Sequence, residues 1–162
     1  MILVANGCSH TAGSEIESPL QSYCFEKAWP KKLSDKLGMS HVNLAFSGAS
    51  CERVVRTSIE KLHLLKQQPS YNPSQIFFVV MWPDIWRTEL HETEKNESGF
   101  FDDGWSPMVS GNDEVYKNQF SRSAYFYYKS WVIRINQHQE SVRWYNNLLL
   151  LQNILISHKI KY

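Results

Sequence analysis

A serine capable of nucleophilic chemistry follows the first apolar run of the chain. The run Ile2–Ala5 is uniformly apolar, Gly7 permits a sharp backbone turn, and Ser9 comes two residues later. We expect Ser9 near the start of a short helix, where the partial positive charge of the helix N-terminus favours an oxyanion or an alkoxide. The same pattern also suits a serine that only caps a helix after a strand, so both interpretations stay open at this point.

Spacing excludes two other turns that carry similar residues. A phosphate-binding P-loop requires a glycine, four residues and then Gly-Lys-Ser or Gly-Lys-Thr, but five residues separate Gly7 from Gly13 and no lysine follows them directly. The nucleophile elbow of α/β-hydrolases is Gly-x-Ser-x-Gly, and Thr11 stands where its second glycine should be. Ser9 therefore belongs to neither of these motifs.

Three predicted strands and the helices between them must position this turn. Apolar periodicity predicts strands over Ile2–Asn6, His41–Ala45 and Ile76–Trp82, and helices over Glu26–Leu37, Cys51–Gln68 and most of 114–157, with a break near 136–140. The apolar first and third strands are typical of strands covered on both faces. We expect a three-layer α/β/α domain with a short parallel sheet, the first strand in its middle and right-handed crossovers.

The whole chain, 1–162, is predicted to form a single domain with one insertion. Residues 88–113 are acidic and contain several glycines, which predicts a long loop or lid at the edge of the sheet. Residues 14–23 are polar and are predicted to form a loop. The last segment, His158–Tyr162, is predicted to begin one further strand.

Composition and charge exclude several classes of partner. A formal net charge of +1 gives no general attraction to nucleic acid or to an anionic membrane. Apolar runs such as Leu148–Leu151 and Ile76–Trp82 are far too short to span a membrane. The three cysteines are an odd number and no signal peptide precedes Gly7, so we expect free thiols and a cytoplasmic protein. The cysteines and histidines lack the spacing of a zinc site, so we expect neither a metal nor a cofactor.

A second turn of the same kind follows the second predicted strand, in the stretch NLAFSGAS from Asn43 to Ser50. Taken with residues 7–13, it resembles the SGNH (GDSL-like) hydrolases, with Cys8 in place of the usual aspartate. The resemblance implies a flavodoxin-like strand order, Ser9 as the nucleophile and Gly48 as the donor of a backbone N–H to the oxyanion. Gly48 as an ordinary turn glycine before a helix remains the alternative.

After the third predicted strand the chain departs from the family pattern. The family commonly has Gly-x-Asn-Asp there, whereas this chain has Met81 to Asp84 and no matching asparagine. Small phage-type SGNH-like proteins have instead a tryptophan followed by an arginine and an acid, which Trp82, Arg87 and Glu89 resemble. The resemblance therefore implies that Trp82 and Arg87 bind substrate. A surface ion pair of Arg87 with Glu89 or Asp84 is the alternative.

The family's last block, Asp-x-x-His, supplies the catalytic base and is absent from this chain. The resemblance therefore implies a C-terminally truncated member. His10 adjoins Ser9 in sequence, although a neighbouring side chain on a turn usually points away. We expect an esterase or carbohydrate deacetylase that is impaired by the missing block and acts on an ester or acetylated carbohydrate. The alternative is a catalytically silent structural or binding module with protein partners in an assembly, incorporated in a virion.

Overall fold

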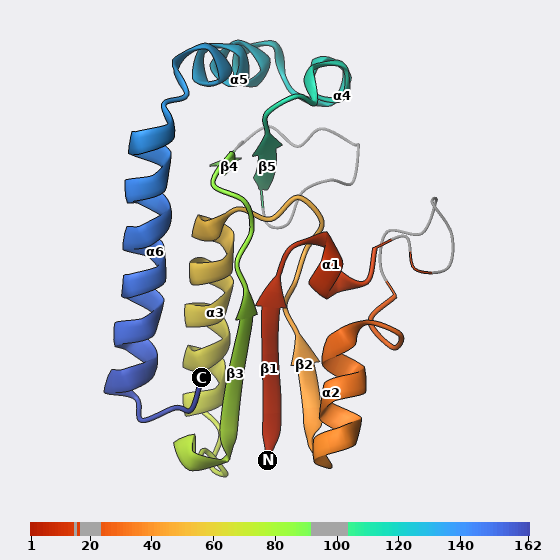
Figure 1. Cartoon of the computed structure of the whole chain (residues 1–162), viewed down its shortest axis with the longest axis vertical. Helices are drawn as coiled ribbons and strands as arrows, with labels where there is room; N and C mark the ends of the chain where they lie inside the picture. Colours follow the sequence, from red (N-terminus) through yellow and green to blue (C-terminus); the bar gives the residue numbers. More distant parts are fainter. Residues whose placement is uncertain (15, 17–23, 92–103) are drawn as a thin grey trace.

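The computed structural model describes residues 1–14, 16, 24–91 and 104–162, which fold around a parallel sheet (Figure 1). The strands are β1 (Ile2–Gly7), β2 (Ser40–Asn43), β3 (Ile76–Met81), β4 (Arg87–His91) and β5 (Trp105–Val109). The helices are α1 (Ser9–Ala12), α2 (Trp29–Leu37), α3 (Cys51–Lys66), α4 (Asp113–Gln119), α5 (Arg122–Arg134) and α6 (Gln137–Ser157), and Pro73–Gln75 form a 3-10 turn. The chain is therefore mixed α/β, as the sequence predicts.

The parallel sheet has the strand order β2-β1-β3, which confirms that the first strand lies in the middle. Ile2 lies opposite Ser40 of β2 and Ile76 of β3, and all three strands run in the same direction. β2 ends at Asn43, before the predicted boundary at Ala45. The cause is local, because the Asn43 side chain accepts a hydrogen bond from the Ala45 N–H at 3.1 Å and turns the backbone.

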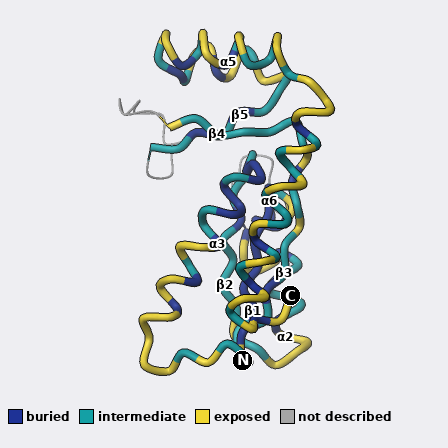
Figure 2. The backbone as a smooth tube through the Cα atoms, turned by 90° about the vertical axis from the view of Figure 1, so that its left-hand side faces the viewer, coloured by how far each residue is buried: buried dark blue, intermediate teal, exposed yellow. Residues whose placement is uncertain are grey.

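Helices cover both faces of the sheet because residues of the same strand alternate between its faces. Val4 packs in one apolar cluster with Val54 of α3 and Leu151 of α6. Its neighbours Leu3 and Ala5 are fully buried on the opposite face, where α2 packs on β1 and β2. Figure 2 shows this concentration of buried residues along β1 and the adjacent side of α3.

The segment predicted as a long insertion, 88–113, contains most of β4 and all of β5. These two strands form an antiparallel pair in which Arg87 lies opposite Val109 and Glu89 opposite Pro107. Sequence patterning missed them because β4 has no apolar run and β5 contains a proline, which a two-stranded edge tolerates. Residues 92–103, and most of the predicted loop 14–23, lie outside the described residues.

The C-terminal half forms three helices, where the sequence predicted two. The break near Asn136 is confirmed, and its side chain accepts hydrogen bonds from the His138 and Gln139 N–H groups to cap α6. A second break falls at Ser121, whose hydroxyl accepts a hydrogen bond from the Ala124 N–H at 3.2 Å and caps α5. α4 and α5 lie beyond the carboxyl ends of the parallel strands (Figures 1 and 2).

A second, smaller apolar cluster joins β5 to these two helices. It consists of Met108, Tyr116, Phe120, Ala124 and Tyr128, which are all buried. The Tyr116 hydroxyl also accepts a hydrogen bond from the Val109 N–H of β5 at 2.8 Å. None of the described helices is both long enough and apolar enough to cross a membrane.

Candidate functional site at the carboxyl edge of the sheet

The Ser9 turn links β1 to α1 at the carboxyl edge of the parallel sheet. Cys8 is extended and occupies the N-cap position, so Ser9 is the first residue of α1. The N–H groups of Thr11 and Ala12 each donate to the Cys8 carbonyl oxygen at 3.0 Å. Gly13, with φ of 74°, ends this single helical turn in the left-handed conformation. The turn leaves Ser9 half-buried.

Gly7 is needed at the end of β1 because two neighbours crowd it. A β-carbon built on Gly7 would lie 2.7 Å from the Met81 carbonyl oxygen and 2.5 Å from Thr11 Oγ1. Met81 lies opposite Gly7 in β3, so one of these approaches is to backbone and no side-chain rotation can relieve it. Any larger residue would push β1 and β3 apart directly before Ser9.

A buried asparagine, Asn6, fixes the end of β1 to α3. Asn6 is 1% exposed, and its Oδ1 accepts a hydrogen bond from the Gly7 N–H at 2.8 Å. Its Nδ2 donates to the Val54 carbonyl oxygen at 3.0 Å and lies 2.9 Å and 3.0 Å from the hydroxyl oxygens of Thr57 and Ser58. Sequence reasoning gave Asn6 no role, although a lone polar residue at the end of an apolar strand was a usable signal.

The loop that carries Gly48 lies beside the Ser9 turn. The Asn43 side chain donates to the Thr11 carbonyl oxygen at 2.7 Å, and the Phe46 N–H donates to the Gly7 carbonyl oxygen at 3.2 Å. Gly48 itself has φ of 78° and faces the hairpin, because a β-carbon there would lie 3.2 Å from Pro107 Cβ. The two turns singled out from the sequence therefore share one edge of the sheet.

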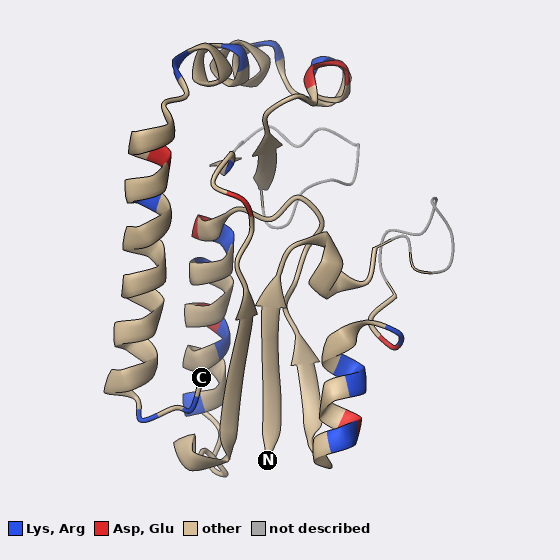
Figure 3. Cartoon of the chain, in the orientation of Figure 1, with Lys and Arg blue, Asp and Glu red and all other residues tan. Residues whose placement is uncertain are grey.

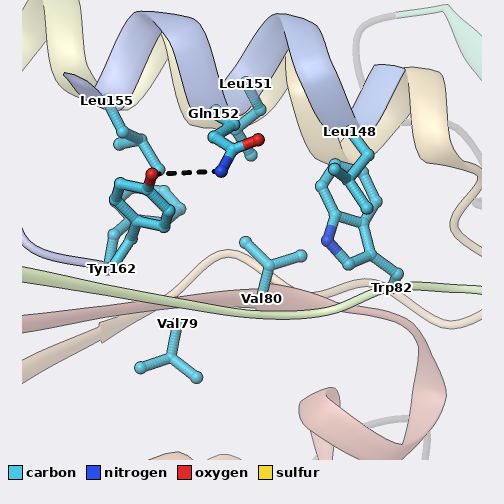
Figure 4. A pocket seen from close by; sticks show the side chains of 9 residues that line it. Val79, Val80, Trp82, Leu148, Leu151, Gln152, Leu155 and Tyr162 are labelled. Carbon is cyan, nitrogen blue, oxygen red and sulfur yellow. Dashed lines mark hydrogen bonds between the residues drawn. The ribbon is translucent and has the colours of Figure 1, made fainter. Parts of the chain in front are cut away.

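Trp82 points to α6 and packs in the layer on that face of the sheet. Its indole ring meets that of Trp144 edge to face, with 6.1 Å between the ring centroids. Figure 4 shows Trp82 and Val80 on the side of α6 and Val79 on the opposite side of the strand. The Trp144 Nε1–H donates to the Pro83 carbonyl oxygen at 3.1 Å and so anchors the chain where it leaves β3.

The Arg87 backbone also contacts α6, through Arg143, which precedes Trp144 in the helix. Its carbonyl oxygen accepts a hydrogen bond from Arg143 Nη2 at 2.8 Å, and its own Nη1 is buried without a hydrogen-bond partner among the described residues. The expected alternative, an ion pair with Glu89, is not formed, because Glu89 binds Arg56 through two hydrogen bonds of 3.1 Å and 3.2 Å. In the described part of the chain, no hydrogen bond joins Arg87 to Ser9.

An ion-pair network centred on Arg143 joins α6 to α3, and Arg143 also donates a hydrogen bond to the backbone of β4. The Arg143 guanidinium pairs with Glu52 at 3.0 Å and with Glu140. Glu140 is 6% exposed, and a carboxylate is buried to that extent only when it is paired. The network ties α6 to the start of α3, so it positions the helices that support the sheet edge.

Within the described residues, no histidine is hydrogen-bonded to Ser9. His10 is exposed and lies in the last turn of α1. The same residues contain no group of three metal-ligating side chains that could hold an ion. The described residues offer a hydroxyl and a neighbouring backbone turn, but none of them is hydrogen-bonded to that hydroxyl as a proton acceptor.

The three cysteines are free and buried, as expected from their odd number. Cys51 begins α3, and its Sγ lies 3.9 Å from the Pro83 carbonyl oxygen. Burial, and secondarily the neighbouring Glu52 carboxylate, raise the pKa of the Cys51 thiol to about 12.

We expect Cys51 to resist alkylation in the folded protein. With its pKa at about 12, roughly one thiol in 10⁴ is ionised at pH 8, and the thiolate is the reactive form. Treatment with iodoacetamide at pH 8, followed by peptide mass spectrometry, should leave Cys51 unmodified over a time in which the urea-unfolded chain reacts fully. Rapid modification in native buffer would contradict this burial.

The chain belongs to a family that is described as a family of unknown function (DUF6071), whose model matches residues 12–162. The matched range includes the Gly48 loop, β3 and every later element, and it begins three residues after Ser9. No curated protein and no solved structure matches the chain.

Proposed function

We propose that this member of DUF6071 is an SGNH-type serine hydrolase domain with impaired turnover, which binds an ester or an acetylated carbohydrate at the Ser9 turn. One observation carries the proposal. The Ser9 turn and the Gly48 loop follow neighbouring parallel strands, and the Asn43–Thr11 and Phe46–Gly7 hydrogen bonds hold them together. Ligands of α/β proteins bind at this edge, beyond the carboxyl ends of the strands. The strand order β2-β1-β3 is compatible with the flavodoxin-like order of that family.

The chemistry proposed for this site is acyl transfer. The Ser9 hydroxyl attacks the carbonyl carbon of the ester and loses its proton to water, while the Gly48 N–H donates to the carbonyl oxygen as it becomes an oxyanion. The oxyanion then collapses, the bond from the acyl carbon to the alcohol oxygen breaks, and the alcohol leaves with a proton from water; a second water hydrolyses the acyl-serine. A fixed donor of this kind stabilises the transition state by roughly 2.7–4 kcal/mol. A serine hydroxyl is a poor nucleophile at neutral pH unless a base removes its proton, and no described histidine is hydrogen-bonded to Ser9. In this proposal the chain therefore binds the ester or acetylated carbohydrate but hydrolyses it slowly.

The test compares the wild-type chain with Ser9→Ala and with Ser14→Ala, a half-buried serine just beyond α1, as the matched control. We expect p-nitrophenyl acetate hydrolysis barely above background, because loss of triad members costs on the order of 10⁶ in turnover. Ser9→Ala should change this rate little. A slow covalent reaction with a fluorophosphonate probe should still label Ser9, survive in Ser14→Ala and disappear in Ser9→Ala.

Two results would contradict parts of this proposal. A robust esterase rate that Ser9→Ala abolishes would show that the chain holds a functional base. A complete absence of fluorophosphonate labelling, in protein shown to be folded by circular dichroism, would remove the hydrolase assignment altogether.

A second candidate function is a catalytically silent module in an assembly such as a virus particle. The outward face of α6 favours it. Residues 144–157 include no charged side chain, and Tyr145, Leu150 and Ile156 are 55%, 49% and 55% exposed (Figure 3). Depletion of charge is typical of the core of a protein interface. A blank probe reaction together with concentration-dependent sedimentation would favour this function over hydrolysis.

A further inference from the structure

The β4–β5 hairpin and the two helices after it form a separate unit beyond the carboxyl ends of the parallel strands (Figures 1 and 2). We call β4, β5, α4 and α5 together the lid. The buried apolar cluster of the lid, which includes Met108 and Tyr128, has no residue in common with the cluster that joins the sheet to α3 and α6. The described residues therefore form two apolar cores, and a rigid-body movement of the lid would leave both of them packed.

Ionic and hydrogen-bonding contacts link the lid to the helices that support the sheet. Glu89 of β4 accepts hydrogen bonds of 3.1 Å and 3.2 Å from Arg56 of α3, and the same guanidinium lies over the Trp105 ring, 4.9 Å from its centroid. At the start of β4, Arg143 of α6 donates to the Arg87 carbonyl oxygen at 2.8 Å. Polar interfaces of this kind between two cores of one chain are typical of units that move relative to each other.

The chain enters and leaves the lid through two short connections. Residues 85–86 form a turn before β4, and residues 135–136 join α5 to α6. A groove of about 550 Å³ lies between α5 and α6, with Tyr127 and Trp131 on one side and Asn147 and Leu150 on the other. The groove gives α5 room to tilt, and hinges of a few residues are sufficient for the movement of such a unit.

The lid is closed over the Gly48 loop in this structure. A β-carbon built on Gly48 would lie 3.2 Å from Pro107 Cβ and 3.9 Å from Val109 Cγ2, so β5 packs directly on this loop. Gly48 is the oxyanion donor of the function proposed above. The hairpin therefore restricts the approach of a substrate to the Gly48 loop.

We propose that the lid opens and closes over the Gly48 loop and that the Arg56–Glu89 ion pair holds it closed. Arg56 has a second carboxylate within 3.6 Å, that of Glu60 on its own helix. When the lid opens, Arg56 keeps Glu60 as its partner, and the Glu89 carboxylate, whose side chain is 5% exposed in the closed form, enters water. Each charge has a partner or solvent in both forms, which keeps the difference in free energy between them small. The control of access to Gly48 depends on the proposed function, whereas the movement itself does not.

Distances between two nitroxide labels provide the first test. The lid pair, Phe126→Cys with Leu64→Cys, joins α5 to α3. The control pair, Tyr145→Cys with Leu64→Cys, joins α6 to α3 outside the lid, and the three side chains are 60%, 55% and 55% exposed in the order Phe126, Leu64, Tyr145. Double electron–electron resonance should give a major and a minor distance for the lid pair and one distance for the control pair. The unsubstituted chain, whose cysteines are buried, is the blank for labelling.

Two substitutions on α3 provide the second test. Arg56→Gln leaves the Glu89 carboxylate buried without this partner in the closed form, so the minor distance should become the main one. Glu60→Gln removes only the partner that Arg56 uses in the open form, and it should not increase the minor distance. The fluorophosphonate probe should label Ser9 about threefold faster, or more, in Arg56→Gln than in wild type. Circular dichroism shows whether both variants fold, and the wild-type distances do not depend on either of them.

Three outcomes would overturn the proposal. A single distance for the lid pair in wild type would show that the lid is a fixed part of the fold. An unchanged distribution in folded Arg56→Gln would show that the Arg56–Glu89 pair does not hold the lid closed. Equal labelling of Ser9 in wild type and in an opened Arg56→Gln would show that the lid does not control access to Gly48. If Ser9 is labelled in neither chain, the proposed hydrolase function fails, and the label distances alone decide whether the lid moves.

Discussion

Gly7→Ala is expected to destabilise the fold by about 3 kcal/mol or more, because overpacking costs most where the crowded neighbour is backbone. The new β-carbon would lie 2.7 Å from the Met81 carbonyl oxygen, so β1 and β3 must separate to admit it. The Ser9 turn would move with them. Urea unfolding followed by circular dichroism measures the loss, and a chain that no longer accumulates as soluble protein would be the extreme form of the same result.

Gly38→Ala is the matched control for this substitution. Gly38 also has a positive φ, of 63°, but a β-carbon there would meet no atom within 4 Å. Its cost should be the backbone strain alone, about 1–2 kcal/mol for a left-handed residue other than glycine. Similar losses in the two variants would show that Met81 and Thr11 yield easily and that the end of β1 is not tightly packed.

Asn6→Asp is expected to lower the free energy of unfolding by about 3–5 kcal/mol at pH 7, the range found when a buried charge is left without a partner. The carboxylate would place an oxygen where Nδ2 now donates to the Val54 carbonyl oxygen at 3.0 Å. Burial raises the pKa of the introduced carboxyl in the folded state above its unfolded value. The variant is therefore most stable below the unfolded pKa and loses stability as pH rises through the folded pKa.

The measurement is urea unfolding of wild type and Asn6→Asp at pH 4.5 and pH 7.5, with each variant compared with wild type at the same pH. Asn72→Asp is the control, because Asn72 is exposed and its Oδ1 only accepts hydrogen bonds from Ser74, which a carboxylate also does. A deficit in Asn6→Asp that is equal at both pH values would contradict the assignment of Nδ2 as an essential donor.

Burial on both faces is the reason that the parallel sheet could be predicted from the sequence. Ile2–Ala5 form a continuous apolar run because helices cover β1 on both faces. Ile76–Met81 are equally apolar, but only Ile76 and Phe78 are buried there and Met81 is 46% exposed, so coverage of this strand on both faces is not observed. Arg87–His91 has no such run, since among the described residues its one strand neighbour is the short hairpin partner β5. The break at Ser121 was also missed, because neither glycine nor proline marks it and a single hydroxyl cap makes it.

Only those residues of the candidate site that directly follow a predicted strand could be located from the sequence. Ser9 and Gly48 could be placed at one edge because each follows a parallel strand. The polarity of Asn6 at the end of an apolar run was a usable signal, but its partner Val54 could not be recognised, since it is 48 residues away in the chain. The orientation of Trp82 was available from strand alternation, because it has the same parity as Phe78 and Val80, which face α6. That parity indicates a packing role for the indole.

The central position of β1 has a consequence during synthesis. β1 leaves the ribosome before both of its neighbours in the sheet, and its partner β3 begins about 70 residues later, which at 5–20 residues per second takes about 4–14 s. For that time the strand whose residues Leu3, Val4 and Ala5 become fully buried has at most one neighbouring strand. A nascent chain that ends at α3 therefore lacks the β3 neighbour that helps to bury these residues in the folded protein.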